Sequence, residues 1–401
     1  MKPNKLYVFT KLFLKRVKTA LIQLYPPIIE FAGNNTQKQK RALISYIPRS
    51  INMRDNDLHL KGHSNWWECR EIARILSDLG YNVDAIAHDN STYTLSRKYD
   101  LVVDVGRNLQ RIAPYLPESA KKFLLLPGAY PFYACLSETN RALDFERKTS
   151  RPTDLKHCYI PVFAIDKSLR VADACMLIGN DWTLSTYPEK YRDKTVKIQV
   201  SASDTGVVSK RYDPQKPFLK SFLFYNNHCA VWKGLDLIFE AFSRHPEWCL
   251  EICGGAEKDS AFISACAPWL EKANVKFHGF TIPCSEKFQN IINSVDAFIT
   301  PSCTDGTNTS VLTCMQTGLY PIISRQTGVN LPNGCGIRLR DANNNDSELT
   351  ADAVEEAVIR FLAKPVSDIT DEAAKCREFT LSHHSRQAYH DSVKNFFEEH
   401  L

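Results

Sequence analysis

The sequence predicts an α/β protein of two Rossmann-like, doubly wound parallel-sheet domains that face each other across a cleft. Two series of alternating apolar strands and amphipathic helices carry this prediction, one before about residue 215 and one after it. The length of 401 residues exceeds what one hydrophobic core normally organises, which favours two domains. Ligands of such sheets bind at the carboxyl ends of the strands, so the cleft is the expected site.

Residues 1–40 are predicted to form a basic amphipathic segment followed by a polar linker at 33–40. Lys11, Lys15 and Arg16 interrupt its apolar positions, which rules out a spanning helix and the apolar stretch of a signal peptide. On a helix, the apolar side chains gather on one side and the basic ones mostly on the other. Such a helix can lie on an anionic membrane surface or pack on a protein surface, and the sequence leaves both open.

The first domain is predicted to span residues 41–215. A helix at 66–79 ends at Gly80, because glycine commonly stops a helix, and a long loop at 51–65 precedes it. The strand expected at 81–87 shows alternation, and further strands are expected at 41–47, 101–105, 121–126, 158–165, 174–178 and 196–200.

The second domain is predicted to span residues 216–380, with a last helix in 381–401. Short apolar runs alternate here with segments of helical periodicity, which again indicates βαβ units. The expected strands are 222–225, 248–253, 275–278, 297–300 and 320–324, and the expected helices are 233–242, 260–273, 286–294 and 310–317.

The loop from Pro301 to the helix near Ser310 is the most informative local pattern. A strand runs into a small polar loop that opens directly into a helix, whose free N–H groups and positive dipole end can bind an anion. Asp305 stands at the tip of the loop, and Thr309 or Ser310 can cap the helix. On the pattern alone, a capped surface turn explains the same residues.

Two further elements point to a phosphate-bearing ligand. Lys233 stands near the start of a helix, where it can reach a diphosphate held by neighbouring strand ends. Gly254 and Gly255 directly follow a strand and let the backbone approach a ligand closely. The chain lacks the phosphate loop of P-loop proteins and the G-x-G-x-x-G fingerprint, which disfavours an NTPase or a dehydrogenase.

Composition narrows the function classes further. The net charge of +5 is diffuse, which disfavours a nucleic-acid binder. Thirteen cysteines are scattered without a C-x-x-C pair or zinc spacing, which favours reduced thiols of a cytoplasmic protein over disulfides or a metal site.

The order of KGLDLIFEAF, PEWCLEICGG, VKFHGF and SVDAFITPSCTDGTNTSVLTCMQTGLYPIISRQTG resembles the donor-binding domain of retaining glycosyltransferases of family 4, which have the GT-B fold. The resemblance covers about residues 222–328 well. HSNWWECREIARILSDLGYNVD and ADACMLIGNDWTLSTYP resemble the acceptor-side half of a bacterial branch that makes surface polysaccharide. In GT-B proteins the last helix crosses back onto the first domain, so the same is expected of 381–401.

The resemblance implies roles for individual residues. Lys233 would neutralise the departing diphosphate, and Asp305, in place of the first Glu of the family's Glu-x7-Glu signature, would bind hydroxyls of the donor sugar. Thr313 stands where the second Glu usually binds the ribose, and Asn227 and His228 lie where an Arg is common. The other residues implied in donor binding, besides Gly254 and Gly255, are Gly279, Phe280, Thr281, Gly306, Thr307, Asn308, Thr309, Ser310 and Val311.

On the acceptor or donor-sugar side, the candidates are His63, Ser64 and Asn65, just before a helix, and Tyr130, after a strand. Tyr130 occupies a turn where relatives often place a His. Each of these is also an ordinary loop residue on pattern alone.

The resemblance therefore implies a retaining, hexosyltransferase-like enzyme that moves a sugar from a nucleotide-diphosphate donor to a glycan or lipid-linked hydroxyl, in surface polysaccharide or lipopolysaccharide synthesis. No cofactor and no metal are expected, since no D-x-D motif stands where a metal-dependent transferase would use it. The expected location is the cytoplasm, with peripheral contact at the inner face of the plasma membrane. The alternative, motivated by Thr313 and the missing Arg, is a catalytically weak or inactive sugar-nucleotide-binding subunit of a glycan assembly complex.

Overall fold

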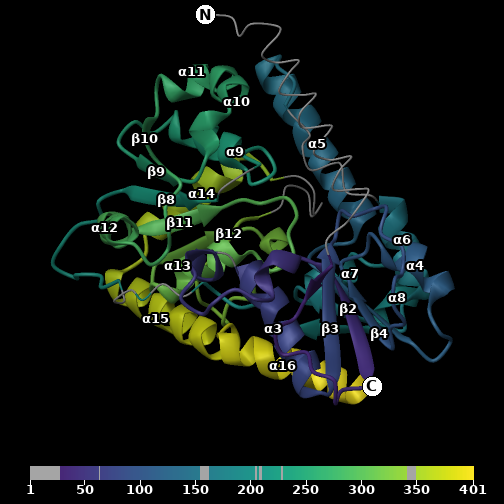
Figure 1. Cartoon of the computed structure of the whole chain (residues 1–401). Helices are drawn as coiled ribbons and strands as arrows, with labels where there is room; N and C mark the ends of the chain where they lie inside the picture. The colour runs from purple at the N-terminus through teal and green to yellow at the C-terminus, as the bar shows by residue number, and fades with distance from the viewer. Residues whose placement is uncertain are drawn as a thin grey trace, which may run out of the picture.

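The computed structural model describes residues 28–62, 64–153, 162–203, 206, 210–226, 229–340 and 349–401. They form two α/β domains, each built on one sheet (Figure 1). The amphipathic pattern of residues 1–27 lies outside the described residues.

The first sheet has seven strands in the order β1-β3-β2-β4-β5-β6-β7. All neighbours are parallel except β1, which runs antiparallel to β3. Buried strands covered on both faces read as continuous apolar runs, which is why their sequence signals are clear. The strands are β1 (Ile29–Glu30), β2 (Lys40–Tyr46), β3 (Tyr81–Ala87), β4 (Leu101–Asp104), β5 (Lys121–Leu126), β6 (Ala174–Ile178) and β7 (Thr195–Ile198).

The second sheet is entirely parallel, in the order β10-β9-β8-β11-β12-β13. This is the doubly wound order 3-2-1-4-5-6, which places a topological switch point between β8 and β11. The strands are β8 (Ser221–Tyr225), β9 (Cys249–Cys253), β10 (Asn274–Gly279), β11 (Ala297–Thr300), β12 (Tyr320–Ile323) and β13 (Ile337–Arg338).

Helices cover the sheets of both domains. In the first domain they are α2 (Leu58–Gly62), α3 (Ser64–Asp78), α4 (Leu109–Ile112), α5 (Pro131–Thr149), α6 (Val162–Val171), α7 (Asp181–Ser185) and α8 (Glu189–Arg192). In the second domain they are α9 (Leu235–Phe242), α10 (Ser260–Ala265), α11 (Ala267–Leu270), α12 (Glu286–Ser294), α13 (Thr309–Gln316), α14 (Ala351–Leu362) and α15 (Val366–His383), and α16 (Arg386–His400) ends the chain.

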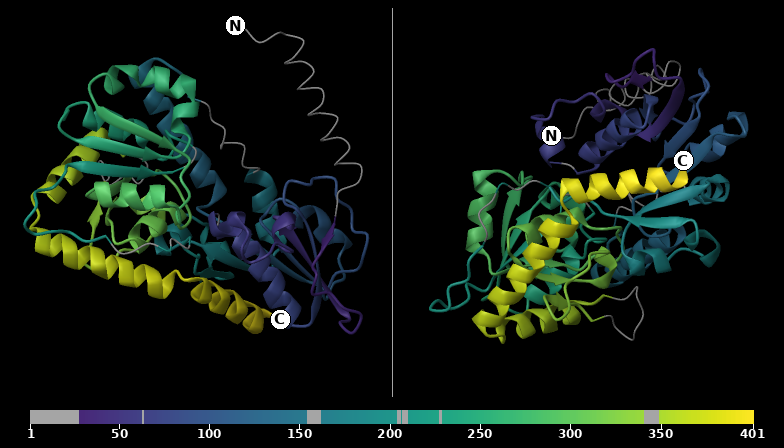
Figure 2. Two further views of the ribbon diagram at one scale, coloured as in Figure 1. Left: turned by 60° about the vertical axis from the view of Figure 1, so that its left-hand side comes forward. Right: turned by 90° about the horizontal axis from the view of Figure 1, so that it is seen from below.

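Helix α16 leaves the second domain and packs on the first. Figure 2 shows α15 and α16, in yellow, running from one domain to the other. Phe396 lies against Phe123 of β5, with ring centroids 5.2 Å apart, and Tyr389 meets Trp67 of α3 at 5.6 Å. Lys121 Nζ donates to the carbonyl oxygen of His400 at 2.8 Å.

Helix α5 makes a second link between the domains. It rises from the first domain beside the second (Figure 1), where Phe145 stacks on Phe262 of α10 at 5.8 Å. The Arg141 guanidinium meets the Asp236 carboxylate of α9 at 2.6 Å, and both side chains are 2% exposed. The link therefore contains a buried ion pair.

Replacing Asp236 with alanine is expected to destabilise the protein by about 1.5–3 kcal/mol, because buried Arg141 loses one charge-assisted hydrogen bond and keeps only the partly exposed Asp144 carboxylate, 2.9 Å away. Denaturant unfolding measures the change. The double variant Arg141→Met/Asp236→Leu is expected to regain most of the loss, since it buries no charge. A loss below about 1 kcal/mol in the single variant would contradict this, because that is the range of exposed pairs.

The structure corrects several predicted elements. The strand expected at 158–165 is wrong from residue 162 onward, where α6 begins, and 158–161 lie outside the described residues. β5 and β6 are parallel neighbours, so the chain between them must cross over, and α5 and α6 supply that crossover. The expected linker at 33–40 is hydrogen-bonded to β3, because the Asn34 side chain donates to the Val83 carbonyl oxygen and accepts from the Val83 N–H. The expected loop at 51–65 contains α2 and the start of α3.

The cysteines among the described residues are all free thiols, and most are buried. Within the same residues, no helix combines the length and apolar character that crossing a bilayer demands.

Candidate functional site

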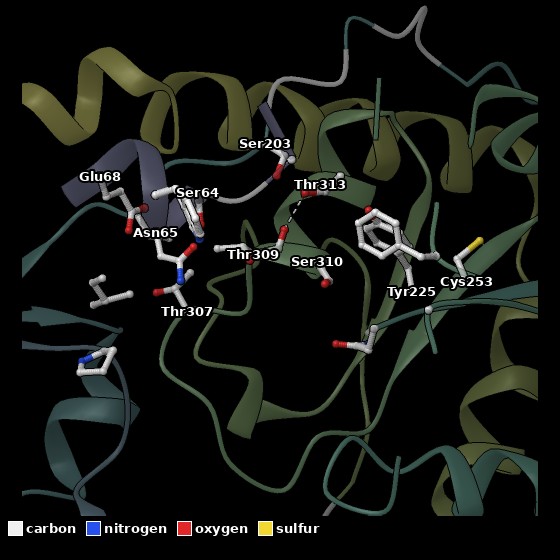
Figure 3. A pocket seen from close by; sticks show the side chains of 18 of the residues that line it. Ser64, Asn65, Glu68, Ser203, Tyr225, Cys253, Thr307, Thr309, Ser310 and Thr313 are labelled. Atoms are coloured by element: carbon white, nitrogen blue, oxygen red, sulfur yellow. Dashed lines mark hydrogen bonds between the residues drawn. The ribbon is translucent and has the colours of Figure 1, made fainter. Parts of the chain in front are cut away.

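A cavity of about 550 Å³ lies between the two domains (Figure 3). The first domain contributes ends of strands β2 and β6 and the start of α3. The second contributes ends of β8 and β9 and the start of α13. Its lining residues are Tyr46, Gly62, Ser64, Asn65, Trp66, Glu68, Pro127, Ile178, Val200 and Ser203 from the first domain and its edge, and Tyr225, Asn226, Cys253, Gly254, Phe280, Thr281, Thr307, Thr309, Ser310 and Thr313 from the second.

The amino-terminal end of α13 opens onto this cavity. Asn308, rather than the expected Thr309 or Ser310, caps the helix, because its Oδ1 accepts from the Val311 backbone N–H at 3.1 Å. Thr309 and Ser310 form the first turn and line the cavity. The positive end of the helix therefore faces a space large enough for a small-molecule ligand.

Thr313 stands one turn further along α13 and also lines the cavity. Its hydroxyl donates to the Thr309 carbonyl oxygen at 2.7 Å, as the dashed line in Figure 3 shows. Because threonine is uncharged, this position presents no negative charge to the cavity, unlike the Glu that the resemblance implies here.

Lys233 and Asp305 form an ion pair behind the α13 cap. Lys233 Nζ lies 2.6 Å from each carboxylate oxygen, and the two side chains are 13% and 15% exposed. Asp305 Oδ2 also accepts from Ser302 Oγ at 2.8 Å and from Asn308 Nδ2 at 2.9 Å. The pair is thus joined to the helix cap, although neither residue belongs to the described cavity lining.

The turn before α9 holds Lys233 in this position. Gly234 has φ +75°, and a Cβ there would overlap the carbonyl oxygen of Pro301. The Trp232 indole N–H donates to the Thr304 carbonyl, and Lys233 Nζ lies 4.9 Å from the centre of the Trp232 ring. Because Gly234 is the N-cap, α9 begins at Leu235, two residues after the predicted start.

The tip of the Asp305 loop touches the first domain. The Ala129 N–H donates to the Asp305 carbonyl oxygen at 3.3 Å. A Cβ on Gly306 would overlap the carbonyl oxygen of Pro127 and lie 2.6 Å from that of Ile178. Gly306 therefore lies in the contact between the domains.

The structure brings together only part of the predicted site. Ser64 and Asn65 lie on the cavity at the start of α3, opposite Thr307 and Thr309 (Figure 3). Tyr130 does not line the cavity, and its hydroxyl donates to Asp166 Oδ1 at 2.9 Å. Phe280, Thr281 and Gly254 line the cavity, whereas Gly255, Gly279 and Val311 are not in its lining, and His63, Asn227 and His228 lie outside the described residues.

Glu68 is a lining residue that the sequence analysis missed. It is 1% exposed, and burial raises the pKa of its carboxyl to about 7. The carboxylate accepts from the Ser201 N–H and hydroxyl, at 3.1 and 3.2 Å to Oε1. The signal was its position one turn after Ser64 and Asn65, which places all three on neighbouring parts of one helix face.

Solved structures show which fold this is. The chain aligns over 90% of its length with sucrose-phosphate synthase from Thermosynechococcus elongatus (98% of that chain, 14% identity, TM-score 0.60). It aligns over 90% with HepE from Anabaena in complex with UDP and glucose (99% of that chain, 10% identity, TM-score 0.55). It also aligns over 90% with WaaG, a glycosyltransferase involved in lipopolysaccharide biosynthesis (99% of that chain, 12% identity, TM-score 0.54). The predicted GT-B fold is confirmed.

The second domain carries the family signal. Residues 220–360 match the family model described as "Glycosyl transferases group 1". The sequence has no significant match among curated proteins. Together, the GT-B fold and the matched domain support a glycosyltransferase of the GT-B type.

Proposed function

We propose that the protein is a retaining glycosyltransferase that moves a sugar from a nucleotide-diphosphate donor to a hydroxyl of a glycan or lipid-linked acceptor, in surface polysaccharide or lipopolysaccharide synthesis. One observation carries the proposal. The start of α13 opens onto the interdomain cavity, and the Lys233–Asp305 pair joins its cap at the carboxyl ends of β8 and β11. Positive groups converging at a topological switch point suit a diphosphate.

In this proposal Lys233 exchanges part of its contact with Asp305 for the donor diphosphate. The acceptor oxygen forms a bond to the anomeric carbon as the bond from that carbon to the phosphate oxygen breaks. The acceptor proton passes to the leaving phosphate on the same face, which retains the anomeric configuration. Lys233 and the α13 amides stabilise the charge that develops on the phosphate, so the proposed reaction is metal-independent.

Addition of UDP is expected to raise the melting temperature of the protein. A ligand that binds only the folded state stabilises it by about 2.7 kcal/mol at a hundred times its dissociation constant. UDP is the first probe because the neighbour HepE was solved with UDP, and GDP and ADP test other bases. Uridine is the control, because it lacks the diphosphate that α13 and Lys233 would bind. Failure of every nucleoside diphosphate to shift the melting temperature would overturn the proposal.

The second candidate is a sugar-nucleotide-binding subunit without turnover. It is favoured by Thr313, which places no carboxylate where the ribose would be bound, and by the mutual pairing of Lys233 and Asp305. A hydrolysis assay with UDP-glucose separates the two candidates. Nucleotide binding without any hydrolysis or transfer favours the subunit.

We also propose a cytoplasmic location with peripheral contact at the inner membrane surface. The cytoplasmic location rests on the scattered cysteines, and the membrane contact on the amphipathic pattern of residues 1–27.

A further inference from the structure

The first-domain wall of the cavity contains a carboxyl group that the proposed chemistry does not use. Glu68 lies on α3, one turn after Ser64 and Asn65, and Figure 3 shows these side chains facing the start of α13 across the cavity. Its Oε1 is fixed by the N–H and hydroxyl of Ser201. The side chain is therefore held in one place on the wall.

Glu68 has no cationic partner among the described residues. The titratable groups that face it are Tyr46 at the end of β2, Cys69 on α3 and Tyr389 on α16. Burial raises the pKa of each of these three groups, that of Cys69 to about 11, so all are neutral at pH 7. A buried carboxyl without a countercharge is costly, and such groups concentrate at functional sites.

The two walls of the cavity differ in the ligand groups they suit. The positive end of α13 suits an anion. The carboxylate form of Glu68, which predominates above about pH 7, repels anions and accepts hydrogen bonds from hydroxyl groups. Ser64 and Asn65 add polar groups, and Trp66 adds an aromatic side chain to the same wall. Hydroxyl-binding groups beside an aromatic ring fit a neutral sugar.

We propose that Glu68, together with Ser64, Asn65 and Trp66, forms the acceptor subsite of this cavity, and that it selects a neutral, hydroxyl-rich sugar over a phosphorylated or carboxylated one. The inference rests on the proposed function, in which α13 takes the donor diphosphate. Glu68 accepts a hydrogen bond from an acceptor hydroxyl and takes no part in bond breaking.

The test uses the full chain saturated with UDP, so that α13 and Lys233 are occupied. Binding of methyl α-D-glucoside, methyl α-D-galactoside and methyl α-D-mannoside is measured by saturation-transfer NMR, with glucose 6-phosphate as the anionic counterpart. The wild-type protein is expected to bind at least one glycoside more tightly than glucose 6-phosphate. Glu68→Gln is expected to lower the affinity for that glycoside by about fivefold to tenfold, because one charge-assisted hydrogen bond is lost. Tighter binding of glucose 6-phosphate, or no glycoside binding, overturns the inference.

The control variant is Glu71→Gln. Glu71 lies on the same helix, but its carboxylate bonds His390 Nδ1 at 2.7 Å and is not in the cavity lining. It is expected to leave glycoside affinity unchanged. An equal loss in Glu71→Gln and Glu68→Gln would show a structural effect of α3 and contradict the inference.

The pH dependence of glycoside affinity distinguishes a direct contact of Glu68 with the sugar from a structural role. The carboxylate form of Glu68 grows as the pH rises through about 7, so wild-type glycoside affinity is expected to fall as the pH falls from about 8 to about 6. Glu68→Gln is expected to show no such dependence. It is also expected to fold at least as stably as wild type at the upper pH, because it removes a buried charge. A pH dependence retained in Glu68→Gln contradicts the inference.

Two arms separate this inference from the proposed function. Failure of UDP, GDP and ADP alike to bind the wild-type protein would reject the proposed function itself. In the second outcome, UDP still binds, and Glu68→Gln lowers the affinity for UDP-glucose but not for the glycosides. That outcome would assign the Glu68 carboxyl to the donor sugar and reject the acceptor subsite.

Discussion

Replacing Lys233 with alanine is expected to lower turnover of the sugar nucleotide by roughly two to three orders of magnitude, the usual cost of removing one preorganised charge-stabilising group. The amine is the positive group that would meet the leaving diphosphate. The variant is expected to stay folded, because Asp305 keeps its hydrogen bonds from Ser302 and Asn308. Steady-state kinetics with the sugar nucleotide selected by the nucleotide screen measures the effect.

Lys364→Ala is the matched control for that measurement. Lys364 pairs with the Glu372 carboxylate at 2.6 Å, like the Lys233 pair, but it lies away from the interdomain cavity. The turnover of the Lys364→Ala variant is expected to equal that of the wild-type protein. A Lys233→Ala variant that turns over at the wild-type rate would remove Lys233 from the mechanism.

Replacing Gly306 with alanine is expected to push the two domains apart at the Asp305 loop. The added Cβ would overlap the Pro127 carbonyl oxygen and crowd that of Ile178, and these backbone atoms cannot rotate away. Displacing the Asp305 loop by about 1 Å relative to the first domain is expected to cost on the order of a hundredfold in the rate of the proposed reaction. Steady-state kinetics measures the lost turnover.

Gly128→Ala tests the same contact from the other side. A Cβ on Gly128 would lie 3.3 Å from the Gly306 nitrogen, which is tight but can be relieved by a small shift. The expected loss is therefore much smaller than for Gly306→Ala. Equal effects of the two substitutions would mean that the closeness of Gly306 to Pro127 does not decide the domain arrangement.

The core of the fold was predictable because buried parallel strands leave a local signal. The predicted ranges of β3, β5 and β6 equal the observed ones. β6 and most of β5 are apolar runs, and β3 alternates between apolar and polar residues, and both patterns are typical of strands. The start of α13 was predicted within one residue, and its opening onto the cavity follows from the strand–loop–helix order.

Features set by distant contacts were not predictable. α5 exposes Leu136 and Leu143, and its buried Arg141 pairs with a residue of the other domain, so its pattern lacks a clean apolar stripe. Glu68 reads as an ordinary charged helix residue until Ser201 and the cavity surround it. The position of Gly306 against Pro127 depends on how the two domains meet, which no local spacing encodes.

The crossing of α16 also affects how the protein is made. Lys121 meets His400 across 279 positions of sequence, and Phe123 of β5 packs on Phe396. The first domain therefore has an apolar surface around β5 that α16 covers only after the whole second domain has been synthesised. Until α16 has been made, that surface is exposed to other nascent chains and to chaperones.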